Sequence, residues 1–147
     1  MTTKLDFVEA SQVRIIPQGA SKHDTLDMLI EAVCRNPVIT DCDAFRKAVY
    51  EREAVQSTGI GGGVAVPHVR IPEVTKMTIA LGIAPDGIDF AALDNRPVQI
   101  IVLFATPKDS EKTYLSLLAK VMVTLRNHET FASLASCRSA EEVIALL

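Results

Sequence analysis

One histidine in this 147-residue chain stands in a position suited to nucleophilic chemistry. Pro67 fixes its own φ and keeps Val66 extended, so His68 is predicted to lie directly after a strand end. A neutral imidazole, whose unperturbed pKa is about 6.5, can attack phosphorus, and the N–P bond that forms is labile enough to pass the phosphoryl group on. His68 is therefore a candidate phosphoryl acceptor. A single histidine is more often structural or solvated, and that interpretation stays open at this point.

Phosphoryl transfer also needs groups that neutralise the phosphoryl oxygens, and the segment before His68 contains several of the right types. They are a guanidinium, two hydroxyls and the backbone N–H groups of a glycine loop, contributed by Arg52, Ser57, Thr58, Gly61, Gly62 and Gly63. Each has a plainer interpretation, because arginine suits a helix C-terminus and the others are common in tight connections. The glycines lack a Walker A lysine and precede a strand, which excludes the common nucleotide-binding motifs.

Composition and charge exclude several classes of function. The formal net charge is −3 and there is no basic block, so nucleic acid is not expected as a partner. The apolar runs are far shorter than the ~20 residues that cross a bilayer. The first residues lack the apolar core of a signal peptide, so a cytoplasmic protein without membrane insertion is predicted. No histidine or cysteine has a second ligand at metal-binding spacing, so no metal is expected.

The cysteines Cys34, Cys42 and Cys137 form no C-x-x-C pair. Because an odd number cannot be fully paired within one chain, we predict reduced thiols that serve as small buried side chains. Reduced thiols are also what a cytoplasmic location implies.

The elements that must position these residues alternate between strands and helices. Apolar runs predict strands at 13–16, 64–66, 77–83 and 98–104. Capping residues and helical spacing predict helices from Ser21 to Asn36, from about Thr40 to the glycines, from about 109 to 127, and from Ser139 onward. The run at 98–104 is almost wholly apolar, which is typical of a central strand covered on both faces. With no linker in the chain, residues 1–147 are predicted to form one α/β domain, a mixed β-sheet flanked by helices in layers.

The stretch around His68, taken as a whole, resembles the signature of type-2 enzyme IIA domains, the fructose and mannitol class of the phosphoenolpyruvate-dependent phosphotransferase system. The resemblance rests on Arg52-Glu53, Ser57-Thr58-Gly59-Ile60 and Gly63-Val64-Ala65-Val66-Pro67-His68. It continues nearly along the full chain, through Ser21-Lys22, Asp94-Asn95-Arg96-Pro97-Val98, Lys112-Thr113-Tyr114-Leu115 and Ser139-Ala140-Glu141-Glu142. The length is similar to that of free-standing IIA domains of the nitrogen-regulatory subtype.

The resemblance implies a phosphotransferase component with a phosphohistidine intermediate. By it, His68 accepts a phosphoryl group from the small carrier HPr or a paralogue, with Arg52 beside it, and passes the group to a IIB-type acceptor or uses it as a regulatory signal. It also implies the IIA fold, a mixed sheet flanked by helices, with no metal and no organic cofactor. The alternative is a degenerate IIA-like module that binds regulatory partners without being phosphorylated.

Two positions depart from the family pattern and motivate that alternative. Val69 stands where the family usually has glycine, so the chain is predicted to leave His68 in an extended conformation. Tyr114 stands where the family commonly has a second histidine, and its hydroxyl can donate one hydrogen bond but does not become a cation near neutral pH. Docking is predicted to use apolar residues near His68, with Ile60, Val69 and Ile71 as candidates.

Overall fold

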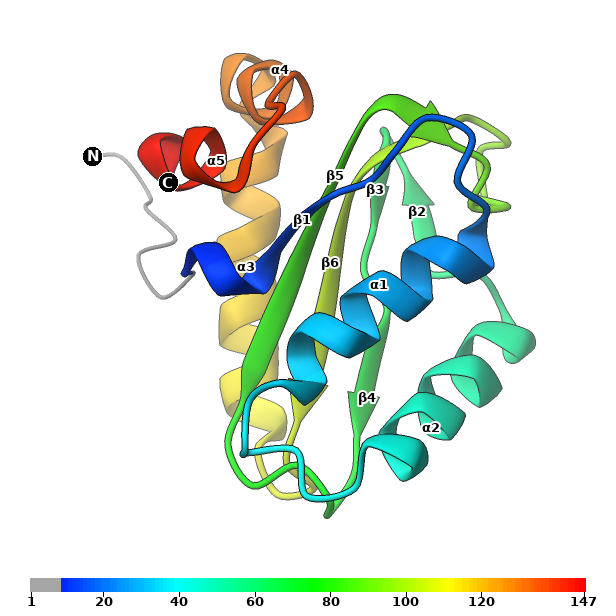
Figure 1. Ribbon diagram of the computed structural model, residues 1–147, viewed down its shortest axis with the longest axis vertical. Helices are drawn as coiled ribbons and strands as arrows, with labels where there is room; N and C mark the ends of the chain where they lie inside the picture. The colour runs from blue at the N-terminus through cyan, green and yellow to red at the C-terminus, as the bar shows by residue number, and fades with distance from the viewer. Residues whose placement is uncertain (1–8) are drawn as a thin grey trace.

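A computed structural model describes residues 9–147 of the chain (Figure 1). Within these residues, the strands of one mixed sheet are β1 (Val13–Ile15), β2 (Gly59–Gly61), β3 (Val64–Ala65), β4 (His68–Arg70), β5 (Thr78–Ile88) and β6 (Val98–Thr106). The strand order is β1-β5-β6-β3-β2, and β4 follows β3 along the same side of β6. The prediction of no signal peptide was based on residues 1–8, which lie outside the described residues.

Helices cover both faces of this sheet (Figure 1). The helical elements are η1 (Ala10–Gln12), α1 (Lys22–Cys34), α2 (Cys42–Val55), α3 (Glu111–Arg126), α4 (His128–Ala135) and α5 (Ala140–Leu146). One core cluster joins α1 and α2 to the sheet, and the other joins α3, α4 and α5 to its opposite face. The predicted mixed sheet flanked by helices is therefore confirmed.

Strand β6 is the centre of the fold, as its apolar sequence predicted. It pairs antiparallel with β5 on one side and parallel with β3 and β4 on the other. Because side chains alternate along a strand, Ile101 and Leu103 enter the core under α1 and α2, whereas Val102 and Phe104 enter the core under α3. Both sets are buried, which explains why polar residues are nearly absent from this run.

Two of the predicted helix starts are confirmed by their capping hydrogen bonds, whereas Asp41 caps α2 and no side chain caps α3. The Ser21 side chain accepts from the Asp24 N–H at the start of α1, in a capping box. The Ser139 side chain accepts from the Glu142 N–H at the start of α5. These side chains satisfy N–H groups that have no partner within the helix, so the start of each helix can be identified from local sequence.

Several elements differ from the prediction, since η1, β2, β4 and α4 were not predicted as separate elements and β5 is longer than predicted. Strand β5 continues beyond residue 83 through Pro85 and Gly87, because pairing with β6 resumes at Ile88 after an irregularity in the register. Helix α4 was not predicted, although Asn127 caps it by accepting from the Thr130 N–H. Its eight residues are too few for a clear helical period, and packing against α3 and α5 stabilises it.

The prediction of three reduced thiols is wrong for two of them. Cys34, at the end of α1, and Cys42, at the start of α2, form a disulfide with a Cα–Cα distance of 5.7 Å. The turn after Asn36 brings the two helix ends together, which the spacing of the cysteines in the sequence did not reveal. Cys137 is free and buried, as predicted for a small apolar side chain. Within residues 9–147, no helix combines the length and the apolar character needed to span a bilayer.

Candidate functional site

A hollow of about 580 Å³ brings together three of the predicted site residues from distant parts of the chain. Arg52 comes from the last turn of α2, His68 from the start of β4, and Tyr114 from the first turns of α3. The hollow lies where the carboxyl end of β6 meets α2 and α3, and Thr106, the last residue of β6, also lines it. Because β4 pairs with β6 in parallel, with His68 opposite Phe104, this placement follows from the sheet register.

The imidazole of His68 is oriented by a backbone carbonyl. Its Nδ1 atom lies 2.9 Å from the carbonyl oxygen of Val66. Since a carbonyl oxygen can only accept, the proton of the neutral ring is on Nδ1 and the lone pair is on Nε2. The side chain is half-buried and lines the hollow. The arrangement therefore leaves Nε2 as the ring nitrogen with a free lone pair. The extended exit predicted for Val69 is confirmed, because this residue is the middle of β4.

Tyr114 stacks on the ring of His68. The ring centroids are 5.5 Å apart with an interplanar angle of 28°, and Phe104 contacts Tyr114 edge-on at 5.4 Å. Burial raises the pKa of the Tyr114 hydroxyl, and the nearby positive charge of Arg52 only partly opposes this shift. Tyr114 is therefore a neutral hydrogen-bond donor at physiological pH, and it holds the plane of the imidazole.

Arg52 supplies positive charge to the same hollow. Its Nη1 atom donates to the carbonyl of Gln56 at 2.9 Å, so the side chain also closes the C-terminus of α2. Among the ion pairs found in residues 9–147, none involves Arg52, whereas Arg70 at the rim is paired with Glu111 at 3.2 Å. Arg52 therefore retains charge and further N–H donors for an anion beside His68.

The two hydroxyls predicted to contact the phosphoryl group do not reach His68. The Thr58 hydroxyl is buried and donates to the Glu53 carboxylate, which also accepts from Lys22 at 2.8 Å. The Ser57 hydroxyl donates to the carbonyl of Phe90 at 3.0 Å. Neither residue lines the hollow of His68. Both hydroxyls instead hold the end of α2 and the start of β2 in place.

The glycine loop also lies away from His68. Gly61, Gly62 and Gly63 all have positive φ, and the Gly62 N–H donates to the Asp94 carboxylate at 3.1 Å. They form the turn between β2 and β3 at one end of β6, whereas β4 lies toward the other end (Figure 1). At ~3.3 Å per residue, the five steps from Gly63 to His68 span roughly 16 Å. The geometry thus matches the plainer interpretation of the glycines, a tight connection.

The rim of the hollow is more apolar than the sequence indicated. Val55 and Leu115 line it and are 82% and 53% exposed. Of the three predicted docking residues, Val69 and Ile71 line the hollow, Val69 as a buried side chain and Ile71 as a half-buried one, whereas Ile60 is on β2 and does not line it. No local feature of the sequence predicted that Val55 and Leu115 are exposed, because exposure near a helix end depends on which neighbouring elements cover it.

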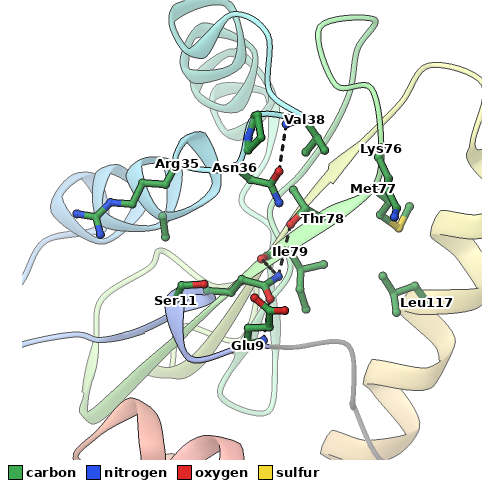
Figure 2. Close-up of a pocket in the computed structure, with 13 residues that line it drawn as sticks. Glu9, Ser11, Arg35, Asn36, Val38, Lys76, Met77, Thr78, Ile79 and Leu117 are labelled. Carbon is green, nitrogen blue, oxygen red and sulfur yellow. Dashed lines mark hydrogen bonds between the residues drawn. The ribbon is translucent and has the colours of Figure 1, made fainter.

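A second hollow, of about 670 Å³, lies between η1, the end of α1 and the start of β5 (Figure 2). The Gln12 side chain lines it and donates to the carbonyl of Ile79 at 2.9 Å. None of the predicted site residues is among those that line it. Within residues 9–147, no three histidine, cysteine or carboxylate side chains gather closely enough to hold a metal ion.

Comparisons with known proteins place this geometry in a family. Residues 6–147 match the family model described as "Phosphoenolpyruvate-dependent sugar phosphotransferase system, EIIA 2". The chain is 26% identical over 135 residues to the fructose-specific EIIABC component of Bacillus subtilis, covering 92% of this chain but only 21% of that longer protein. The crystal structure of the nitrogen regulatory protein IIA-Ntr from Neisseria meningitidis is similar with a TM-score of 0.81 and 26% identity, covering 94% of both chains.

A further similar structure is the complex of enzyme IIA mannitol with phosphorylated enzyme IIB mannitol from Escherichia coli. It has a TM-score of 0.78 at 17% identity and covers 95% of both chains, which supports the fold alone. The family-model match extends over nearly the whole chain, so the protein belongs to the EIIA type-2 family of the phosphotransferase system. Its role is that of a phosphocarrier or of a regulatory protein of this system.

Proposed function

We propose that this protein carries a phosphoryl group on Nε2 of His68. The Nδ1–H contact with the Val66 carbonyl is the observation that carries the proposal, because it leaves the Nε2 lone pair available beside the guanidinium of Arg52. In the transfer step this lone pair attacks phosphorus, the N–P bond forms, and the bond between phosphorus and the donor breaks with its electron pair leaving on the donor. The reverse process at the acceptor regenerates neutral His68.

The charge of the phosphoryl group is matched by residues of the same hollow. A transferred phosphoryl group spreads negative charge over three oxygens, and catalysis consists mainly of positioning and electrostatic stabilisation. Arg52 supplies a cation and Tyr114 a neutral hydroxyl at the edge of the hollow. The glycine loop, Ser57 and Thr58 are left out of this proposal because they line other parts of the molecule.

We infer protein partners on both sides of the transfer. The donor is an HPr-type carrier, and the acceptor is a IIB-type domain or a regulatory target. The exposed apolar side chains of Val55 and Leu115 at the rim of the hollow favour docking of a protein over entry of a free sugar. A IIB-type acceptor is proposed because a mannitol IIA protein of the same fold has been solved in complex with phosphorylated IIB. The proposal includes a cytoplasmic location, because the family's ultimate donor, phosphoenolpyruvate, is an intracellular metabolite.

A regulatory role follows from the same chemistry. Phosphorylation adds nearly two negative charges at the rim of the hollow, which is enough to reverse the preference of a partner for this surface. The similarity to nitrogen regulatory proteins favours such an output. The alternative of a module that is never phosphorylated predicts no adduct on His68.

Intact-mass analysis after incubation with phosphoenolpyruvate, enzyme I and an HPr-type carrier tests the proposal. We expect one acid-labile phosphoryl group on the wild type and none on His68→Ala. His128→Ala is the matched control, because His128 is an exposed histidine at the start of α4. An unlabelled wild type, with a second IIA protein labelled in the same reaction, would overturn the phosphocarrier proposal and leave the binding module.

A further inference from the structure

The hydroxyl of Thr106 is a buried donor without a hydrogen-bond partner. Thr106 is 2% exposed, and its Oγ1 atom makes no hydrogen bond to another described residue. The hydroxyls of the other buried threonines in residues 9–147 are all hydrogen-bonded, at Thr25, Thr58, Thr78 and Thr124. A buried hydroxyl that has lost its water and gained no partner costs free energy, so its presence needs a physical reason.

The position of Thr106 in the sheet places this residue in the wall of the hollow of His68, with its hydroxyl buried beneath the surface of the wall. Thr106 is opposite Arg70 in the β4–β6 pairing, and Phe104 is opposite His68. Because side chains alternate along a strand, Thr106 lies on the same face of β6 as Phe104, which contacts Tyr114. Thr106 lies on the strand next to His68 and two residues further along it. The two backbones are therefore roughly 8 Å apart at these residues. An imidazole that carries a phosphoryl group is long enough to bridge this distance.

The groups around Thr106 carry charges of both signs, and those able to attract an anion are Arg52 and the N-terminus of α3. The hollow is bordered by Glu111, the first residue of α3. The N-terminus of α3 carries a partial positive charge, and the Ser110 side chain does not cap it. Glu111 and Glu51 bring carboxylates to the rim, and Glu111 is paired with Arg70 at 3.2 Å. With Arg52 in the same hollow, a phosphoryl group on Nε2 would have a cation on one side and the Thr106 hydroxyl as a further donor.

We propose that Thr106 Oγ1 donates a hydrogen bond to a phosphoryl oxygen of phosphorylated His68. The inference rests on the proposed function and extends it by adding a phosphoryl-binding residue from the end of β6. In the unphosphorylated protein the hydroxyl is held without a protein partner, and phosphorylation supplies the acceptor. Thr106 therefore stabilises the phosphorylated state specifically, since a hydrogen bond to a charged oxygen is stronger than one between neutral groups.

The test compares Thr106→Val, which keeps the side-chain shape, with Thr106→Ser, which keeps the hydroxyl. For Thr106→Val we expect phosphohistidine to be formed about tenfold more slowly or lost about tenfold faster than in the wild type, which corresponds to about 1.4 kcal/mol. Thr106→Ser should retain the wild-type rates, and the ³¹P chemical shift of the phosphohistidine should change in the valine variant only. The unphosphorylated Thr106→Val protein should unfold at the wild-type urea concentration or above it.

Thr124→Val is the matched control, because the Thr124 hydroxyl is buried and donates to the carbonyl of Lys120 at 2.9 Å. We expect this variant to be less stable but to be phosphorylated normally. Wild-type formation and loss of phosphohistidine in Thr106→Val would overturn the inference while leaving His68 as the acceptor. A loss of stability in unphosphorylated Thr106→Val equal to that of Thr124→Val would also overturn it, by assigning the hydroxyl a structural role. A wild-type protein that is never labelled would overturn the proposed function itself.

Discussion

The orientation of a single imidazole is the central chemical feature of this protein. His68 receives its orientation from the carbonyl of Val66, two residues earlier in the chain, and from the ring of Tyr114. The carbonyl selects the tautomer and the aromatic ring limits rotation of the side chain. Neither contact adds a negative charge to His68, and the carboxylates of the hollow belong to Glu51 and Glu111 at its rim.

At the scale of single residues, the role of Arg52 is open to a direct test. We expect Arg52→Gln to slow phosphorylation of His68 by about 10- to 100-fold, because hydrogen bonds to charged groups contribute about 1.5–3 kcal/mol. The variant should remain folded, since the lost contact with the Gln56 carbonyl is exposed. Single-turnover transfer from a phosphorylated carrier measures the effect. Arg126→Gln, at the far end of α3, is the control, and equal rates in the two variants would remove Arg52 from the site.

At the scale of elements, the turn between β2 and β3 positions the strands and not the phosphoryl group. Gly62 has a φ of +66° and open space where a Cβ would lie, whereas a Cβ on Gly59 would lie 2.8 Å from the Cα of Ala92. The loop is therefore constrained by backbone conformation at one position and by close packing at another.

This difference predicts two separable effects. Gly62→Ala should lower the free energy of unfolding by about 1 kcal/mol, because only the left-handed conformation opposes it. Gly59→Ala should lower it by about 3 kcal/mol, because the backbone of Ala92 must also move. Both proteins should be phosphorylated at the wild-type rate under conditions in which they are folded. Urea unfolding and the transfer assay measure the two quantities, and slow transfer in folded Gly62→Ala would return the glycine loop to the active site.

At the scale of the whole molecule, the disulfide joins the two helices that cover one face of the sheet. Cys34 and Cys42, eight positions apart in the sequence, crosslink α1 to α2, and such a crosslink restricts the unfolded chain. We expect reduction to lower the free energy of unfolding by about 2–3 kcal/mol, measured by urea unfolding with and without a thiol reductant. A Cys34→Ser, Cys42→Ser double variant should show the same loss and no response to reductant. Cys137→Ser should keep that response, and a wild type insensitive to reductant would contradict the pairing.

Much of the fold could be predicted from the sequence, because it depends on residues that are close together in the chain. The caps at Ser21 and Ser139 and the apolar run of β6 were identified from local residue types and period. Pro67 and Val69 likewise predicted the extended backbone around His68. The family resemblance depended on the same local stretches, and the family-model match confirms it. That residues 1–147 form a single domain in the cytoplasm stays a prediction.

Only the tertiary structure decided which distant groups meet. The parallel register of β3 and β4 on β6 separates the glycine loop from His68 although both belong to one continuous motif. The same register places Thr106 in the hollow of His68, and the turn after α1 brings Cys34 to Cys42. Residues that are close in sequence can lie far apart in space within extended strands, because each residue advances the chain by about 3.3 Å. Sheet register and helix packing therefore determined which residues meet at the site, whereas local residue chemistry identified the histidine that we propose as its nucleophile.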